Sequence, residues 1–538
     1  MKGSSNASSA FRGTGVVPVI LVSILTFLSS CAPQHPRDMQ RVDSLRYQAE
    51  DLLKAQALMA FNSCAFGARS NQDSLYKANI NLFTIENVTL LRRAEREEPD
   101  QVQKKRLRYF RRYLTTEYVA QHIAPITDSI ANIEATARVS TGNGTLPYRE
   151  VSGALANERD PQRREILYRA CDPLLDTLNL LRRRVVETSH RLAIDLDYSA
   201  FNAMMEELKD LSLERLKNLA TGVLAQTDSL YKALLVEELR KYLKRDIGQF
   251  HRYDTGILFR NSHFDRFFPS SSMLPAVKST YRTLGIDIDT QKNLTIDDTS
   301  RPSKDPRAYC FAIDVPADIR LSIKPIGGFD DYSALFHEMG HAQHYVNTRE
   351  HALEFKSLGE PTVTETYAFL SEYILANQAW LRSRGTMTPP VLKDFVRFQA
   401  FYRLYYVRRY CAKVLYEIQL HDGAVEPGPL YADLLSKAVG YQRHPSDEKR
   451  HLIDVDANFY SASYLQAWFL ESQLNARLTR DFGFNWFEYP QAGSYLRSLW
   501  AQGDRLNADE FVHSLGDNAI VPDAWLNEIR AMVQFSSK

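Results

Sequence analysis

The sequence predicts a mainly α-helical protein with a small β-hairpin or sheet. Apolar residues recur at helical intervals through much of the 538-residue chain, and no alternation of helix with strand points to a parallel sheet. There is also no internal repeat or low-complexity tract. The clearest helical periodicity lies at residues 43–53, 160–169, 174–196 and 213–243.

Composition and charge limit the possible functions. Hydrophobic residues make up 44% of the chain and charged residues 24%, as in soluble globular proteins with a sizeable core. The net charge is +1, or −1 without the first thirty residues, and this balance gives no electrostatic case for nucleic-acid binding. The five cysteines form no C-x-x-C pair, so neither a zinc ribbon nor a disulfide-dense scaffold is expected.

Residues 1–30 have the features of an export signal, with Lys2 and Arg12 before an uncharged run that is too short to span a bilayer comfortably. The run ends in Leu28-Ser29-Ser30-Cys31, which resembles the lipobox of bacterial lipoproteins. The resemblance implies removal of residues 1–30 and a lipid anchor on Cys31. The mature protein would then be extracytoplasmic in a bacterial cell envelope, held to a membrane by lipid. The alternative is a buried core segment.

Residues 31–150 are expected to form an N-terminal helical region, and a loop at residues 140–145 marks the joint with a second region at residues 151–538. The first region contains a basic and aromatic cluster at residues 104–113. A nucleic-acid patch is one interpretation, but the acidic residues just before the cluster favour a solvated helix face. We therefore expect no nucleic-acid partner.

The clearest strand signal follows a polar, proline-containing connection at residues 287–306. Apolar and polar residues alternate over residues 319–324, and residues 309–313 precede them across a turn at residues 314–318. A short hairpin is expected. Its edge could bind an extended peptide through main-chain hydrogen bonds, or the hairpin could be purely structural.

A helix is predicted after the hairpin, because apolar residues recur at helical spacing from Tyr332 and no proline interrupts the run between Asp330 and Thr348. Asp330 or Asp331 is expected to cap its N-terminus.

This helix contains His337-Glu338-Met339-Gly340-His341. Histidines four residues apart lie on one helix face, where both imidazoles can bind one zinc ion. Glu338 is then placed to take a proton from water at the metal. Gly340 costs about 1 kcal/mol of helix propensity, which a packing need for a small residue would explain.

A catalytic zinc site needs a third protein ligand and leaves one position for water. A helix predicted at residues 360–372 supplies two candidates, since Glu365 and Glu372 lie seven residues apart and share a face. Charge type alone leaves Glu354 and Glu360 open as well.

The motif, with a glutamate 24 residues after His341, resembles gluzincin metallopeptidases of the thimet oligopeptidase/oligoendopeptidase and angiotensin-converting enzyme families. The resemblance implies Glu365 as the third ligand of one Zn²⁺ ion. It also implies two helical subdomains that flank a deep substrate channel and admit unstructured oligopeptides. His344 and Glu372 match further positions of the oligopeptidase family, and we expect them behind the metal ligands.

The resemblance continues near the C-terminus. His451 and Tyr464 match the histidine and tyrosine that stabilise the oxyanion in both families, and Tyr460 shares a helical face with Tyr464. Lys449 is similar to a lysine that binds the substrate's C-terminal carboxylate in the angiotensin-converting enzyme family. That family's tyrosine near the position of Ser461 is missing here.

The sequence therefore predicts a zinc-dependent peptidase that cleaves oligopeptides, with Glu338 as the base. Two alternatives stay open. A dipeptidyl carboxypeptidase would differ by an anchor for the substrate's C-terminal carboxylate. The angiotensin-converting enzyme family has an aspartate four residues after its glutamate ligand, and this position is Phe369 here. A non-catalytic peptide-binding lipoprotein is disfavoured, because the base and all three proposed ligands are present.

Overall fold

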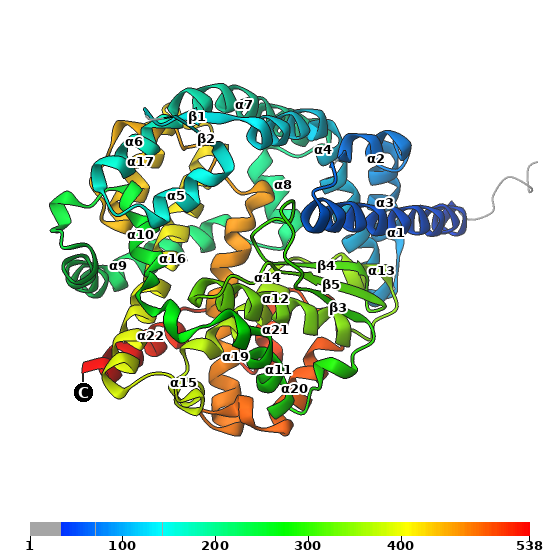
Figure 1. The fold of residues 1–538 in the computed structure, drawn as a ribbon. Coiled ribbons are helices and arrows are strands. Elements are labelled where there is room, and N and C mark those ends of the chain that lie inside the picture. Colours follow the sequence, from blue (N-terminus) through cyan, green and yellow to red (C-terminus); the bar gives the residue numbers. More distant parts are fainter. Residues whose placement is uncertain (1–33, 70, 143, 538) are drawn as a thin grey trace, which may run out of the picture.

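The computed structural model describes residues 34–69, 71–142 and 144–537. The predicted export signal at residues 1–30 and the lipidation site Cys31 lie outside the described residues. Helices make up 73% of the structure, and two small sheets accompany them, so the predicted mainly α fold with a small sheet is confirmed (Figure 1). No helix in the described part of the chain is long and apolar enough to cross a membrane.

The α-helices follow one another along the chain as α1 (Gln34–Phe66), α2 (Gln72–Ala78), α3 (Ile85–Glu97), α4 (Gln101–Thr136), α5 (Val151–Asn157), α6 (Pro161–Ala170), α7 (Asp172–Asp195), α8 (Phe201–Lys209), α9 (Leu213–Glu238), α10 (Thr255–Arg260), α11 (Met273–Thr283), α12 (Phe329–Asn347), α13 (Leu353–Ser357), α14 (Thr362–Tyr373), α15 (Gln378–Arg384), α16 (Pro389–His421), α17 (Pro427–Val439), α18 (Pro445–Glu448), α19 (Tyr460–Phe482), α20 (Pro490–Trp500), α21 (Ala508–Ser514) and α22 (Asp523–Ser537). The strands are β1 (Arg138–Ser140), β2 (Thr145–Pro147), β3 (Leu294–Asp297), β4 (Tyr309–Asp314) and β5 (Asp318–Ser322).

The long helices lie close to where the periodicity predicts them. α6, α7 and α9 cover the expected segments, and the last of these continues as a π-helical turn at Leu239–Leu243. Figure 1 shows one group of helices around α5, α6 and α7 and another around α12, α14 and α20.

The predicted cap of α12 is wrong. The helix begins at Phe329 with Gly328 before it, so the aspartates lie within its first turn. The carboxylate of Asp331 instead accepts hydrogen bonds from the N–H groups of Ile326 and Gly327, each at 2.7 Å, and so fixes the loop that leads into the helix.

The predicted hairpin is present within a three-stranded sheet. β4 and β5 pair antiparallel, with Phe311 opposite Arg320, and β3 pairs parallel with the other side of β5. Strand β3 was not predicted, because its two apolar residues, Leu294 and Ile296, are too few to give an alternation signal. β4 is an edge strand of this sheet. The loop predicted at residues 140–145 is the turn between β1 and β2.

One hydrophobic core extends across both predicted regions. Its buried side chains run from Val42 in α1 to Ile529 in α22, and α1 packs against β4. The boundary near residue 150 is therefore not marked by a separate core. Cys64, Cys171, Cys310 and Cys411 are all free thiols.

The basic cluster at residues 104–113 is not the solvated helix face that we expected. Its side chains are half-buried or buried on α4, where most of the cations pair with acids from other segments. The pairs are Lys105–Glu510, Arg106–Glu354, Arg108–Glu95, Arg111–Glu95, Arg111–Glu207 and Arg112–Asp210. These cations join α4 to the rest of the fold.

The contact between α12 and α14 is the most extensive between any two elements of the described chain. At its centre, a Cβ on Gly340 would come within 2.5 Å of the Tyr367 carbonyl oxygen and 2.6 Å of the Ala368 Cα. The packing need inferred from the sequence is therefore a direct approach of two helix backbones.

We predict that Gly340→Ala lowers the free energy of unfolding by about 1–3 kcal/mol, because the added methyl group has no space between the helices. Gly222→Ala is the matched control, since Gly222 also lies inside a helix but its nearest neighbour would be 3.9 Å away. That change should raise stability by up to about 1 kcal/mol. Urea denaturation of both variants measures the difference, and equal stabilities would contradict the packing argument.

Candidate metal centre

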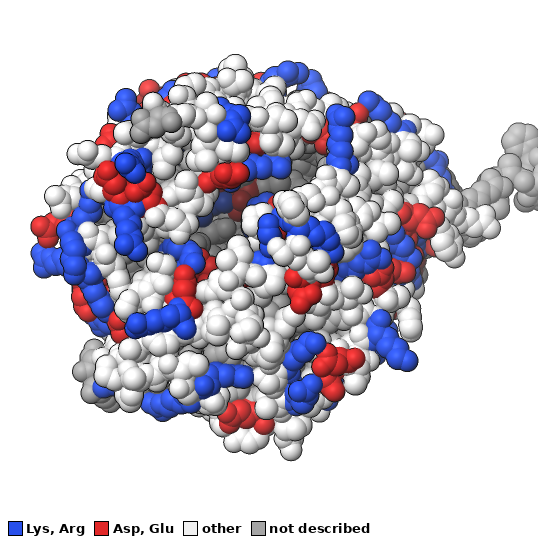
Figure 2. Space-filling view, in the orientation of Figure 1, with Lys and Arg blue, Asp and Glu red and all other residues white. Residues whose placement is uncertain are grey.

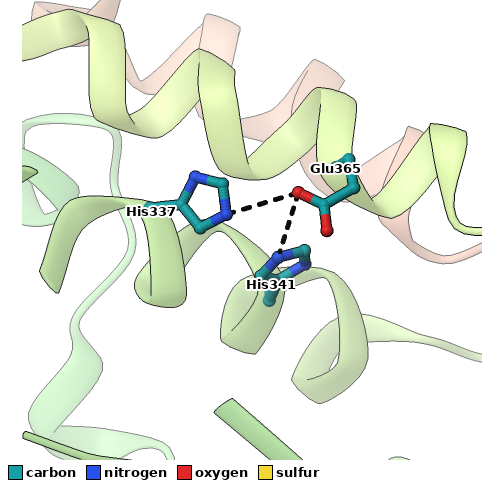
Figure 3. A group of neighbouring side chains, drawn as sticks. All are labelled: His337, His341 and Glu365. Atoms are coloured by element: carbon teal, nitrogen blue, oxygen red, sulfur yellow. Dashed lines mark ion pairs between the residues drawn. The ribbon is translucent and has the colours of Figure 1, made fainter. Parts of the chain in front are cut away.

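Three predicted ligands meet where α12 and α14 cross (Figure 3). His337 and His341 come from α12 and Glu365 from α14, and their ligand atoms lie within 4.8 Å of one another. The Oε2 atom of Glu365 lies 3.3 Å from Nε2 of His337 and 3.6 Å from Nε2 of His341. The geometry therefore offers two nitrogens and one oxygen to a single ion.

Hydrogen bonds behind the histidines fix which nitrogens face this point. Nδ1 of His337 lies 3.0 Å from Glu372 Oε2, and Nδ1 of His341 lies 2.9 Å from Thr364 Oγ1. The Glu372 carboxylate can only accept, and the Thr364 hydroxyl donates to Tyr345, so both Nδ1 atoms are assigned as N–H donors. The Nε2 atoms then face Glu365 and are the nitrogens that would bind a metal.

A buried oxygen that accepts no hydrogen bond provides the test of whether a metal fits. Glu365 is 2% exposed, and its Oε2 atom has no hydrogen-bond partner. Such an atom costs free energy unless a cation or donor satisfies it. A divalent ion bound by His337, His341 and Glu365 would do so, and the donor set suits Zn²⁺.

The close approach of the histidines and glutamates shifts their pKa values. Burial lowers the pKa of His337, but the carboxylates of Glu365 and Glu372 outweigh it and raise this pKa well above its usual value. Burial raises the pKa of Glu365, but His341 and His337 outweigh it and hold this pKa far below its usual value. The site therefore keeps Glu365 ionised, as a metal ligand must be.

Glu338 is held by the sheet. Its Oε2 atom accepts the N–H of Cys310 on β4 at 2.7 Å, while Oε1 makes no hydrogen bond to a described residue. Burial raises the pKa of Glu338, although His341 and His337 oppose the shift. One oxygen is thus fixed and the other is available for proton transfer.

A cavity of about 520 Å³ surrounds the group and is bounded by α1, β4, α12, α14 and α19. Figure 2 shows the surface hollowed near the centre of the view, with basic and acidic side chains around the opening. The cavity is lined by the three ligands, by Glu338, and by Tyr460 and Tyr464. Its size falls within the range of small-molecule and peptide-binding sites.

The two tyrosines differ in what they contact. The Tyr460 hydroxyl donates a hydrogen bond to Glu365 Oε1 at 2.6 Å, whereas the Tyr464 hydroxyl makes none to a described residue. Their rings lie 5.0 Å apart. Burial raises the pKa of both phenols, with the Glu365 charge as the next cause, so both keep their protons.

Two other predicted residues do not line this cavity. Nδ1 of His451 lies 2.8 Å from the carbonyl oxygen of Glu448, and burial lowers the pKa of His451. The Lys449 ammonium pairs with Asp176 at 2.5 Å. The structure therefore does not bring His451 or Lys449 to the metal group.

Of the residues expected behind the ligands, Glu372 contacts His337 directly and His344 does not contact either histidine ligand. His344 is fully buried, with its ring 5.0 Å from that of Tyr367, and burial lowers its pKa to about 4. It acts as a packing residue of the helix crossing.

The two other glutamates that the sequence left open as third ligands form ion pairs away from the metal group. Glu354 pairs with Arg46 and Arg106, and Glu360 pairs with Lys209. Sequence reasoning missed Thr364 and the N–H of Cys310. Thr364 precedes Glu365 in the chain, but only the register of the crossing shows that it reaches His341.

No protein-family model and no curated protein matches the chain. The class that the structure defines is a helical protein with a candidate two-histidine, one-glutamate metal site. The resemblance to gluzincin peptidases stays a prediction from the motif residues.

Glu417 on α16 holds the segment that leads into α19. It accepts hydrogen bonds from the N–H of Asp456 at 2.9 Å and from the hydroxyl of Ser461. Burial raises the pKa of Glu417 to about 8, although Lys413 opposes the shift. The folded state therefore binds this proton more tightly than the unfolded chain.

We predict that this group makes the protein less stable as pH rises. Its contribution is fully present below the unfolded pKa of about 4.3 and is lost as pH rises through about 8. Glu417→Gln should remove this part of the pH dependence, an effect of order 4 kcal/mol between pH 5 and 9. Urea denaturation between pH 5 and 9 measures it. The exposed control Glu426→Gln should keep the wild-type profile, and a wild-type profile for Glu417→Gln would contradict the assignment.

Proposed function

We propose that the protein is a zinc-dependent peptidase that hydrolyses peptide bonds of oligopeptides. The observation that carries this proposal is the Glu365 Oε2 atom, which accepts no hydrogen bond and faces the Nε2 atoms of His337 and His341 in a cavity that also holds Glu338. A metal site with an acid–base residue beside it is suited to hydrolysis.

His337, His341 and Glu365 would hold one Zn²⁺ ion, although other divalent ions accept the same donors. When bound, the ion would polarise the substrate carbonyl and lower the pKa of water. Tyr460 would keep Glu365 oriented through the hydrogen bond to its Oε1 atom.

Glu338 would act as general base and then as general acid. Its free Oε1 atom would take a proton from the attacking water and pass it to the leaving amine nitrogen. The raised pKa of Glu338 favours this role, because the carboxyl then holds the proton between the two steps. The hydrogen bond from Cys310 keeps the carboxylate from rotating.

The edge of β4 supports an extended peptide as substrate. The N–H of Cys310 points away from β5 toward Glu338, and strand alternation directs the N–H and C=O of Ala312 to the same side. A peptide segment could pair with Ala312 as an added strand. Its scissile bond would then lie beside Glu338.

Tyr464 is the best oxyanion donor in this cavity, because its phenol keeps its proton and has no competing hydrogen bond. His451 and Lys449 stay candidates from the sequence resemblance alone. The lipid anchor on Cys31 and the envelope location likewise rest only on residues 1–31.

The first test separates metal binding from catalysis. Protein lacking residues 1–31 is incubated with a peptide mixture, with and without a chelator, and cuts are read by mass spectrometry while bound zinc is measured by atomic absorption. We expect Glu338→Gln to keep zinc but lose at least about 10²-fold in kcat. Glu365→Ala should lose zinc. Wild-type protein with no zinc and no cuts would contradict the proposal, and an active Glu338→Gln would remove Glu338 from the mechanism.

The two tyrosines should respond differently to loss of their hydroxyl groups. Tyr464→Phe is expected to lower kcat by about 10²–10³-fold with zinc affinity unchanged, as for removal of an oxyanion donor. Tyr460→Phe is expected to weaken zinc binding by about tenfold or more, because Glu365 loses its orienting donor. Competition with a zinc chelator and steady-state kinetics measure both. The reverse pattern would exchange the two roles.

A further inference from the structure

A second cavity, of about 510 Å³, is lined by residues other than those of the metal cavity. It is bounded by α5, α10, α16 and the first turn of α12. Three guanidinium groups line it, from Arg252, Arg260 and Arg409, and the carboxylate of Asp330 lies among them. Tyrosines on one face of α16 complete the wall.

The arginines of this cavity carry more hydrogen-bond donors than their protein partners use. Arg409 contacts Asp454 through Nη2 alone, so Nε and Nη1 make no hydrogen bond to a described residue. Arg260 binds Asp265 through two nitrogens, at 2.7 and 2.6 Å, and its Nε lies 3.3 Å from Asp330.

The single acid in the wall does not cancel this excess. Burial raises the pKa of Asp330 to about 7, although Arg260 opposes the shift. Asp265 pairs with Arg260, and Asp454 pairs with both Arg252 and Arg409, so these carboxylates offset much of the positive charge. What the guanidinium groups offer a ligand is therefore their unused N–H donors. These donors suit a carboxylate ligand, which guanidinium groups bind through paired hydrogen bonds.

Two helices connect this cavity to the metal group. Asp330 and His337 are seven residues apart on α12, so they share a face and lie about 10 Å apart along the axis. On α16, Tyr406 lines the second cavity, and Tyr410, one turn further, has its ring 5.5 Å from that of Tyr464. An extended chain covers about 10 Å in three residues.

We propose that this cavity binds a carboxylate of the peptide substrate, two or three residues from the bond that is cut. The inference rests on the proposed peptidase function and names its substrate class. The carboxylate is either the C-terminal group of the peptide, which would limit products to short C-terminal fragments, or an acidic side chain within a longer peptide. Arg409, with two free donors, is the principal anchor.

The test compares peptides that differ only in this carboxylate. One apolar sequence is prepared with a free C-terminus, as the amide, and as the amide with Asp at the second or third residue beyond the cut. Binding is measured by fluorescence anisotropy on zinc-loaded Glu338→Gln protein, and cleavage on protein with Glu338 intact. Each is repeated with Arg409→Gln. Arg397→Gln is the control, because Arg397 lies on the same helix and also forms an ion pair, with Glu237.

We expect one of the two carboxylate peptides to bind about 10- to 100-fold more tightly than the plain amide, as for a hydrogen-bonded charged group. Arg409→Gln should reduce this preference to about threefold or less, and Arg397→Gln should keep it. Arg409→Lys, which keeps the charge beside Asp454 but not the planar fork, should give an intermediate preference. The peptide that binds more tightly shows whether the site takes a C-terminal carboxylate or an acidic side chain.

Equal binding of acid and amide peptides, or a preference that Arg409→Gln leaves intact, would overturn the inference. An Arg409-dependent preference without any cleavage would support the carboxylate site and contradict the peptidase proposal. Cleavage of all peptides at equal rates would support the peptidase proposal and contradict the carboxylate site. Protein that binds none of the peptides would contradict both.

Discussion

The close crossing of α12 and α14 is the constraint on which the rest of the structure depends. At Gly340 the two backbones approach so closely that no side chain fits between them. This contact fixes the register of the helices, and His337, His341 and Glu365 all lie within about one turn of it. Ligand geometry is therefore set by backbone packing and not by flexible loops, which is the arrangement that precise metal sites require.

The same crossing explains why α14 supplies both the third ligand and the groups behind the other two. Glu372 and Thr364 reach the Nδ1 atoms of the two histidines from the helix that carries Glu365. One element thus sets the orientation and the tautomer of both imidazoles. A shift of α14 along α12 would disturb all of these contacts together, so the site is expected to form or fail as a unit.

The sequence predicted the helices, the hairpin and the position of the metal motif, because these follow from local periodicity and spacing. It could not choose among the acidic candidates without the family resemblance, because the difference between Glu365 and Glu354 lies in distant partners. Glu354 is neutralised by Arg46 and Arg106, which lie far away in the chain. Strand β3 was missed for a related reason, since it depends on pairing with β5 and not on its own pattern.

The buried carboxylates near the helix crossing differ in how fully their oxygens are hydrogen-bonded. Glu354 has two arginines, and Glu372 has a histidine and the hydroxyl of Ser333. Glu365 accepts a hydrogen bond from Tyr460 on one oxygen, whereas its other oxygen accepts none and has only the two histidine Nε2 atoms near it, at 3.3 and 3.6 Å. An ionised, buried and half-satisfied carboxylate is unfavourable in the absence of a cation. The free energy that a divalent ion gains there is therefore also free energy of folding for the crossing that builds the site.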